Sequence, residues 1–321
     1  MKHLLILFCF LLKSTSLCFS QETGQNTTVY DSFLAKDLSK VQTISELAAE
    51  ILGLTTDHKE QLRMLLLWSD KYMYADTERF FNNREPLSVS NAFKQRIGLC
   101  DEFSGIINEF CKAAKIPCFK VVGYVEEERG LTKDLFEEEN HVWNAVYIDS
   151  SWLLCDLFWS TNKLSSDKLF LKKLDEKYFL ANASVFIENH LPASPVFQLT
   201  DYPIKPKSFR QVDVEMLPYC NFRDSLNRLL KLKDQERTLQ IAQQAYRYNN
   251  DNPNILAIAY YNFGVFIIKN KSEKKEELII ARKLFADAMP LMSRSSKPYI
   301  KGLIASCKSG IDYIDRKLAM K

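Results

Sequence analysis

Residues 100–157 constrain the fold of this 321-residue chain more than any other segment. Over 100–115, apolar side chains recur at positions i, i+3, i+4, i+7, i+8 and i+11, which lie on one face of a helix. Pro117 ends this helix. Strand-like runs follow at 119–125, 141–148 and 152–157. Because Asp149–Ser151 is a turn signal, the last two runs are expected to form a hairpin.

The hairpin brings two chemically useful side chains together. His141 begins one strand and Asp156 ends the next, symmetric about the point between Ile148 and Asp149. Level residues on antiparallel strands point to the same face, with their Cβ atoms about 5 Å apart. A register shift of two residues would keep that face and make the pair diagonal. We therefore expect the Asp156 carboxylate to hold the His141 imidazole in one tautomer.

Cys100 begins the expected helix. There it faces the positive end of the helix dipole and unpaired N–H groups, which favour a thiolate and could receive an oxyanion. A nucleophile at Cys100, a base at His141 and an orienting acid at Asp156 would form a complete set for acyl transfer. The alternative is an inert thiol, and the adjacent Asp101 and Glu102 would oppose a thiolate unless they point to solvent.

These residues also resemble the transglutaminase-like superfamily. Three blocks in order carry the resemblance: "LLLWSDKYMYADTERF", "RIGLCDEFSGIINEFCKAAKIPCFKVVGYV" and "HVWNAVYIDSSWLLCDLFW". The family pattern is a Gly-x-Cys helix start, a His-x-Trp-Asn strand and an Asp in the following strand. By this resemblance Cys100 matches the nucleophile, His141 the base and Asp156 the orienting acid. The later segment "KYFLANASVFIENHLPASPVFQL" resembles the kyphoscoliosis-peptidase-type branch.

The resemblance covers roughly residues 57–210 and implies an α+β, papain-like core, with the nucleophile helix packed on an antiparallel sheet. It implies attack on an amide carbonyl, a thioester at Cys100, and release to water or to an amine. Phe158 departs from the family, in which Asp-x-Thr-Trp is usual. Relatives use a Gln or a Trp as an oxyanion donor, for which Gln95 and Trp68 are the candidates. No segment resembles a dedicated calcium loop, which disfavours a calcium-dependent cross-linker.

The first 20 residues have the character of a secretory signal peptide. Lys2 precedes the apolar run 4–12, and Cys18 and Ser20 place small residues before a cleavage site. The alternative is a membrane anchor, but nine apolar residues fall short of the roughly 20 that span a bilayer. We therefore expect an exported protein, which is secreted, periplasmic or at the cell surface, with no membrane span in the mature chain.

Composition narrows the classes of function. Removing the first 20 residues takes away Lys2 and Lys13 and no acids, so the net charge falls from +3 to +1. A nucleic-acid binder would show a strong basic excess and is not expected. The remaining three histidines are widely spaced and no CxxC pair exists, so neither a metal nor a cofactor is expected.

Six cysteines would remain in the exported chain. Export permits disulfides, whose pairing cannot be read from the sequence. One pair is excluded, because Cys100 and Cys111 would lie about 16 Å apart along a helix. Cys111 and Cys155 are expected to be core thiols.

The chain changes character near residue 212. Shorter helices are expected upstream at 43–54, 57–73 and 88–96, while 21–40 is polar and expected to be loose. Residues 158–212 carry four prolines and suggest irregular wrapping. Beyond them only helices are expected, at about 221–248, 252–269, 275–289 and 297–318.

The C-terminal helices contain a pattern of small and aromatic residues that resembles a tetratricopeptide helix pair. It consists of Ala257, Tyr260, Phe263 and Gly264, followed by Ala281, Phe285 and Ala288. We therefore predict a signal peptide over 1–20, a transglutaminase-like catalytic domain over 21–212, and a helical, tetratricopeptide-like domain over 213–321. Packing on the catalytic domain and recruitment of a protein partner are both open for these helices.

Two functions fit the sequence. The first is a secreted thiol-dependent acyl-transfer enzyme that acts on protein or peptide amides, as a peptidase or amidase. The second is a catalytically silent binding module that uses the fold and the helical tail for protein interaction. The stretch 126–139 carries seven acids against two bases. It is either a solvated loop or an acidic rim that favours cationic substrates, since it leads into His141.

Overall fold

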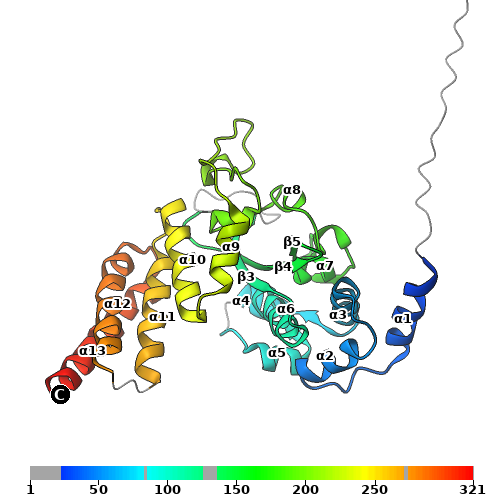
Figure 1. Ribbon diagram of the computed structural model, residues 1–321, viewed down its shortest axis with the longest axis horizontal. Coiled ribbons are helices and arrows are strands. Elements are labelled where there is room, and N and C mark those ends of the chain that lie inside the picture. Colours follow the sequence, from blue (N-terminus) through cyan, green and yellow to red (C-terminus); the bar gives the residue numbers. More distant parts are fainter. Residues whose placement is uncertain (1–22, 83–84, 126–135, 271–273, 321) are drawn as a thin grey trace, which may run out of the picture.

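The computed structural model describes residues 23–82, 85–125, 136–270 and 274–320. The expected signal peptide lies outside them. Figure 1 shows a helical and sheet-containing part on one side and a stack of C-terminal helices on the other. Within the described ranges, no helix combines the length and hydrophobicity that crossing a bilayer requires.

Helices form the beginning of the described chain. The prediction that 21–40 is loose was wrong from Thr23 onward, because Phe33 on α1 is buried in the core. Thr43 caps α2 in a capping box with Glu46, which fixes where that helix begins. The bounds are α1 Thr23–Ala35, α2 Ile44–Leu52, α3 His58–Tyr72, α4 Thr77–Asn82 and α5 Val89–Gln95.

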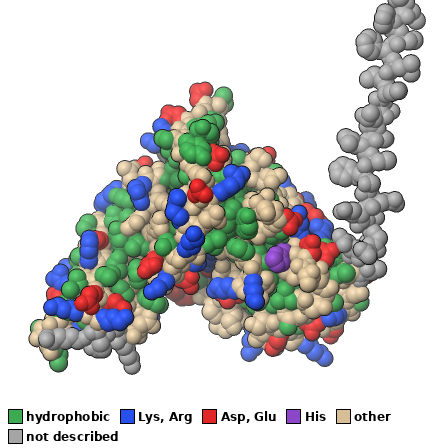
Figure 2. Space-filling model, viewed as in Figure 1, with side chains coloured by type: hydrophobic (Ala, Val, Ile, Leu, Met, Phe, Trp, Pro, Cys, Tyr) green, Lys and Arg blue, Asp and Glu red, His purple; other side chains and the backbone are tan. Residues whose placement is uncertain are grey.

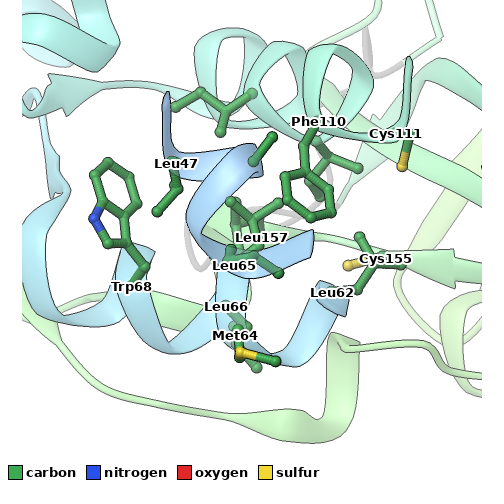
Figure 3. Packing of buried hydrophobic residues seen from close by; sticks show 14 of the residues in the cluster. Leu47, Leu62, Met64, Leu65, Leu66, Trp68, Phe110, Cys111, Cys155 and Leu157 are labelled. Carbon is green, nitrogen blue, oxygen red and sulfur yellow. The ribbon is translucent and has the colours of Figure 1, made fainter. Parts of the chain in front are cut away.

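Helix α6, Cys100–Ala114, forms as the apolar period predicts. Its buried face packs against α2, α5 and the sheet, and its side chains join a core that α3 also lines. Figure 3 shows Phe110 and Cys111 of this helix facing Leu62 and Leu65 across that core. The start of α6 is held by a two-residue parallel pairing of β1, Tyr74–Ala75, with β2, Ile97–Gly98.

The sheet has four antiparallel strands in the order β5-β4-β3-β8. Asp149 and Ser150 form its two-residue turn with φ values of 50° and 63°, the left-handed pair that a type I′ hairpin requires. Ile148 pairs with Ser151, so the register is shifted by two residues from the symmetric one and the diagonal alternative is confirmed. The strands are β3 Cys118–Val125, β4 His141–Ile148, β5 Ser151–Cys155 and β8 His190–Pro192.

Residues 158–212 are more ordered than the expected irregular wrapping. Short elements run through them, and β8 pairs with β3 as an edge strand of the main sheet. Trp143 of β4 packs with Phe186 and Phe197 on the sheet face opposite α6. The short elements include α7 Leu157–Thr161, β6 Asn162–Leu164, β7 Phe170–Lys172 and α8 Ala183–Phe186.

The described residues beyond 212 form five helices, in agreement with the expected helical region, although the first expected helix is divided at 231–233. Phe285 lies between Gly264 and Gly310, where an added Cβ would come within 2.8 Å and 2.7 Å of its ring. The predicted tetratricopeptide character and the boundary near 212 stay predictions. The helices are α9 Phe222–Leu230, α10 Asp234–Tyr248, α11 Asn254–Lys269, α12 Lys275–Arg294 and α13 Pro298–Ala319.

Candidate active site

A cavity of about 970 Å³ opens at the beginning of α6. Cys100 and His141 line it, while Asp156 lies behind His141 and is 1% exposed. Much of its wall is aromatic, and its rim carries charged residues of both signs. The aromatic lining is Phe80, Phe81, Phe158, Trp159, Phe170 and Tyr178, and the charged rim includes Lys163, Lys173, Asp175 and Arg210.

The predicted pairing of His141 with Asp156 is present. His141 Nε2 lies 2.5 Å from Asp156 Oδ2, and both side chains are buried. Asp156 also caps α7 by accepting the Trp159 N–H at Oδ1, so its carboxylate is fixed from both sides. Burial alone would raise the pKa of Asp156, but the charge and hydrogen bond of His141 outweigh burial and hold that pKa well below its usual range.

Cys100 is the second group that acts on the imidazole of His141. Burial alone would lower the pKa of His141, but Asp156 and then Cys100 outweigh burial and raise that pKa to about 10. His141 is therefore an imidazolium at neutral pH. Because Asp156 occupies Nε2, Nδ1 is the nitrogen left for the thiol, which is itself a hydrogen-bond partner of His141.

The two acids that follow Cys100 are both paired with cations. Glu102 is buried and accepts two hydrogen bonds from Arg79, at 2.8 Å and 2.5 Å. It also accepts the N–H of Leu99 at 2.7 Å, which closes the start of α6. Asp101 points outward and pairs with Lys120 at 2.6 Å. Their charges are therefore compensated, which removes the objection that they would oppose a thiolate.

The candidate oxyanion side chains do not reach the cavity. Trp68 is buried and stacked on Phe93 at 4.7 Å, and Gln95 is exposed at the end of α5. Neither is among the cavity-lining residues of the described chain. Phe158 does line the cavity, where it packs edge-on against Phe103. The first-turn N–H groups of α6 lie beside Cys100 and are candidate donors to an oxyanion.

Cys100 is distinguished from the other thiols by its position. The six cysteines in the described part of the chain are free, and Cys111, Cys155 and Cys307 are buried. The contact with Cys118 and then burial raise the pKa of Cys111, and burial raises that of Cys155 above its usual range. The prediction that Cys111 and Cys155 are core thiols is therefore confirmed.

Sequence reasoning missed His190. It was set aside as too far from the other histidines, yet β8 places its Nε2 3.1 Å from the same Asp156 oxygen that bonds His141. The three-residue strand His190–Pro192 is too short to show an alternating pattern. The signal available was its place in the segment that resembles the kyphoscoliosis-peptidase-type branch.

His141, Asp156 and His190 offer three ligand atoms within 4.8 Å, a spacing at which a metal ion could be held. Two ligands of one tetrahedral zinc lie about 3.4 Å apart, given metal–ligand distances near 2.1 Å. The 2.5 Å between His141 Nε2 and Asp156 Oδ2 is shorter than that and matches a charge-assisted hydrogen bond. The cluster therefore fits hydrogen bonding better than metal ligation.

The described end of the acidic stretch contacts the C-terminal helices. Asn252 donates to Glu139 at 2.8 Å, and Glu138 pairs with Lys297 at 2.6 Å and accepts from Tyr299. Glu139 is held in this junction, where burial raises its pKa to about 7. Glu137 is also described and accepts from Ser296 at 3.2 Å, whereas Glu126, Glu127, Glu128 and Asp134 lie outside the described residues.

Comparisons with known proteins agree with the geometry. The family model of the transglutaminase-like superfamily matches residues 45–157. Mouse kyphoscoliosis peptidase is 27% identical over 182 residues, which are 56% of this chain and 27% of that protein. Human kyphoscoliosis peptidase is 27% identical over 216 residues, which are 66% of this chain and 31% of that protein. The chain thus spans less than a third of the length of these relatives.

Solved structures are more distant. The crystal structure of a TGase matches with a TM-score of 0.28 and 14% identity, over 48% of this chain and 42% of that one. Arylamine N-acetyltransferase C from Bacillus anthracis matches with a TM-score of 0.25 and 12% identity, over 66% and 77% of the two chains. These scores are too low to support an argument about this chain.

Proposed function

We propose that this chain is a thiol-dependent acyl-transfer enzyme, because residues 45–157 match the family model of the transglutaminase-like superfamily and the chain is similar to kyphoscoliosis peptidase. Its substrates would be amides of proteins or peptides, and its reaction that of a peptidase or amidase. The observation that carries the proposal is the buried 2.5 Å bond between His141 and Asp156, on an imidazole that also contacts Cys100 at a cavity wall.

The first half of the reaction forms a thioester. The Cys100 thiolate attacks the carbonyl carbon of the amide, and the oxyanion that develops is stabilised by N–H groups at the start of α6. The C–N bond breaks as the His141 imidazolium gives its proton to the leaving amine. Asp156 keeps the imidazole oriented throughout, and the acyl group remains on sulfur.

The second half removes the acyl group. His141, now neutral, takes a proton from an incoming water, whose oxygen attacks the thioester carbonyl. The C–S bond breaks, the acid product leaves and the ion pair of Cys100 with His141 is restored. An amine in place of water would give a new amide by the same steps. Hydrolysis is our proposal because both relatives are named as peptidases.

A thiol-directed electrophilic probe tests the nucleophile. The wild-type chain should be labelled on Cys100, and Cys100→Ala should abolish fast labelling. Cys118→Ala is the matched control, since Cys118 is also half-buried but lies on β3 and is not among the cavity-lining residues described. Equal labelling of Cys100 and Cys118 would instead support the silent binding module.

A peptide library incubated with and without an added amine identifies the reaction. Cleaved, deamidated and cross-linked products differ in mass. We expect cleaved or deamidated peptides whose yield falls in Cys100→Ala. If products form only when the amine is present, the reaction is acyl transfer to the amine and the proposal of hydrolysis is wrong.

Export and a preference for cationic substrates also stay proposals. Export rests on the composition of residues 1–20, and N-terminal sequencing of the protein from its native source would test it. A cationic preference would come from the acidic stretch 126–139, which leads into His141 and includes the four acids Glu126, Glu127, Glu128 and Asp134. Neutralising those four acids should then slow the turnover of Lys-rich peptides more than that of neutral ones.

A further inference from the structure

A second histidine contacts the proposed orienting acid. His190 is 1% exposed, and its Nε2 lies 3.1 Å from Oδ2 of Asp156. The same oxygen bonds His141 at 2.5 Å, so one carboxylate oxygen serves two imidazoles. Nothing in the three-residue reaction described above uses His190.

The surroundings of His190 favour its neutral form. Four aromatic rings enclose it, with centroids 4.6 to 5.4 Å from its own: Trp159, Phe186, Trp143 and Tyr178. Burial lowers the pKa of His190 to about 4, against the opposing effect of Asp156. The titratable groups that face it are Asp156, His141 and Tyr178, with Lys177 at longer range. At neutral pH it is therefore an uncharged ring, which can donate one N–H.

The contacts of His190 continue to the cavity wall. Its Nδ1 lies 2.7 Å from the amide oxygen of Asn189, and the amide nitrogen of Asn189 lies 2.8 Å from the Tyr178 hydroxyl. An amide that is turned over exchanges its oxygen and nitrogen, so Asn189 can serve Nδ1 in either protonation state. Asn189 and Tyr178 line the cavity, whereas His190 is not among its lining residues. A chain of hydrogen bonds thus leaves the cavity at Tyr178 and returns to it at His141.

We propose that His190 is a positioning residue, which donates its Nε2–H to Asp156 and shares that carboxylate oxygen with His141. The second donor fixes the carboxylate and reduces the electron density available to His141. The proposal rests on the function proposed above, because positioning has a consequence for turnover only if Cys100 and His141 react. The effect of His190 on the pKa of His141 can be measured whether or not the chain turns over a substrate.

The test compares His190→Leu with His190→Gln. Leu removes the donor, whereas the amide nitrogen of Gln takes the place of Nε2. In His190→Leu we expect kcat to fall about 10-fold or more with KM nearly unchanged, since a hydrogen bond to a charged group is lost. The alkaline limb of the kcat/KM profile should move to higher pH, because His141 then faces Asp156 without a competing donor. His190→Gln should recover both quantities.

The proposal is overturned if the alkaline limb of kcat/KM lies at the same pH in His190→Leu as in the wild type. It is also overturned if His190→Gln loses as much kcat as His190→Leu. Thermal unfolding checks that each variant folds. Should Leu fail to fold, His190→Asn replaces it, since the shorter amide cannot reach Asp156.

Failure of the enzyme proposal has a separate signature. If wild-type protein and Cys100→Ala show equal activity, the function is wrong while the role of His190 can still be measured. Titration of the imidazole of His141 by NMR should then show a higher pKa in His190→Leu than in His190→Gln. Equal values in the two variants would overturn the positioning role whatever the activity.

Discussion

The cavity region and the C-terminal helices use charged side chains in opposite ways. At the start of α6, beside the cavity, a charge pair is buried, namely Arg79 with Glu102, which are 6% and 1% exposed. In the helices the core is apolar around Phe285, and ion pairs such as Arg282 with Asp315 lie at the surface. Figure 2 shows acidic and basic side chains interspersed over the visible face, without an expanse of one sign.

The difference indicates that the buried charges serve the site, whereas the apolar core of the helices serves stability. A buried ion pair costs desolvation energy and is a weak source of net stability, whereas apolar burial stabilises directly. The buried pairs near Cys100 are therefore best explained by the site that they build. The helices beyond 213 are explained by a core that needs no charge. The junction at Glu139 lies between these two regions and combines features of both.

Asp156→Asn should have the largest effect on activity of the variants that compare the two regions. Asn keeps the size and the cap of α7 but loses the charge that orients His141, so kcat/KM should fall about 1000-fold. Steady-state kinetics on a cleaved peptide measures it. Asp149→Asn is the control, because Asp149 is exposed in the hairpin turn and Asn tolerates its positive φ. Similar losses of kcat/KM in both variants would show that the buried pair of His141 and Asp156 is not what activity depends on.

Arg79→Met tests whether buried charge near the cavity depends on its partner. It leaves Glu102 buried without compensation, and the free energy of unfolding should fall by about 3–5 kcal/mol in urea denaturation. Lys112→Met breaks an exposed pair with Glu109 and should cost less than about 1 kcal/mol. If the two substitutions cost the same, burial is not what distinguishes the cavity region.

Gly310→Ala tests the packing of the helices. The new methyl would lie 2.7 Å from the ring of Phe285, so overpacking should cost about 1–3 kcal/mol of stability. Peptide turnover should not change at a temperature where the variant is folded. Gly302→Ala on the same helix meets nothing within 4 Å and should stabilise by about 0.5–1 kcal/mol. Opposite signs in the two variants would confirm the tight contact, and equal signs would refute it.

Glu139 gives the junction a pH dependence of its own. Its pKa is about 7 in the folded chain against an ordinary 4.5, so the native state holds the proton more tightly. The resulting stabilisation is full below pH 4.5 and is lost as the pH rises through 7. Because Glu139 is only half-buried by area, we expect on the order of 1 kcal/mol. Between pH 5 and pH 8 the free energy of unfolding should fall further in the wild type than in Glu139→Gln, and the difference is the contribution of Glu139.

The cavity cluster should respond in a different pH range. The pKa of His141 is raised to about 10 from an ordinary 6.5, so its stabilisation is full below 6.5 and is lost as the pH rises through 10. A wild-type loss that begins only above pH 6.5, and that Glu139→Gln leaves unchanged, would show that the junction contributes nothing.

Local patterns allowed much of the core to be predicted. The apolar period gave α6, the turn residues gave the β4–β5 hairpin, and alternation within that hairpin put His141 beside Asp156. Each of these depends on residues close in sequence, where spacing decides geometry. The resemblance added the family, which the match over 45–157 supports.

Contacts between distant segments could not be predicted. His190 reaches Asp156 because β8 pairs with β3 across about 65 residues of intervening chain, and no spacing in the sequence encodes that pairing. Arg79 and Glu102 are 23 residues apart and lie on different helices. Helix α1 was missed because its polar composition hides the few residues, such as Phe33, that bury it.

Trapping of the acyl-enzyme tests the central claim most directly. The chain is mixed with an activated acyl ester, quenched in acid within seconds and digested for mass spectrometry. The account predicts one acyl group on the peptide that contains Cys100, formed much more slowly in His141→Ala and absent in Cys100→Ala. Acylation that is spread over Cys118 and Cys220 as much as over Cys100, or that is unaffected by the loss of His141, would contradict it.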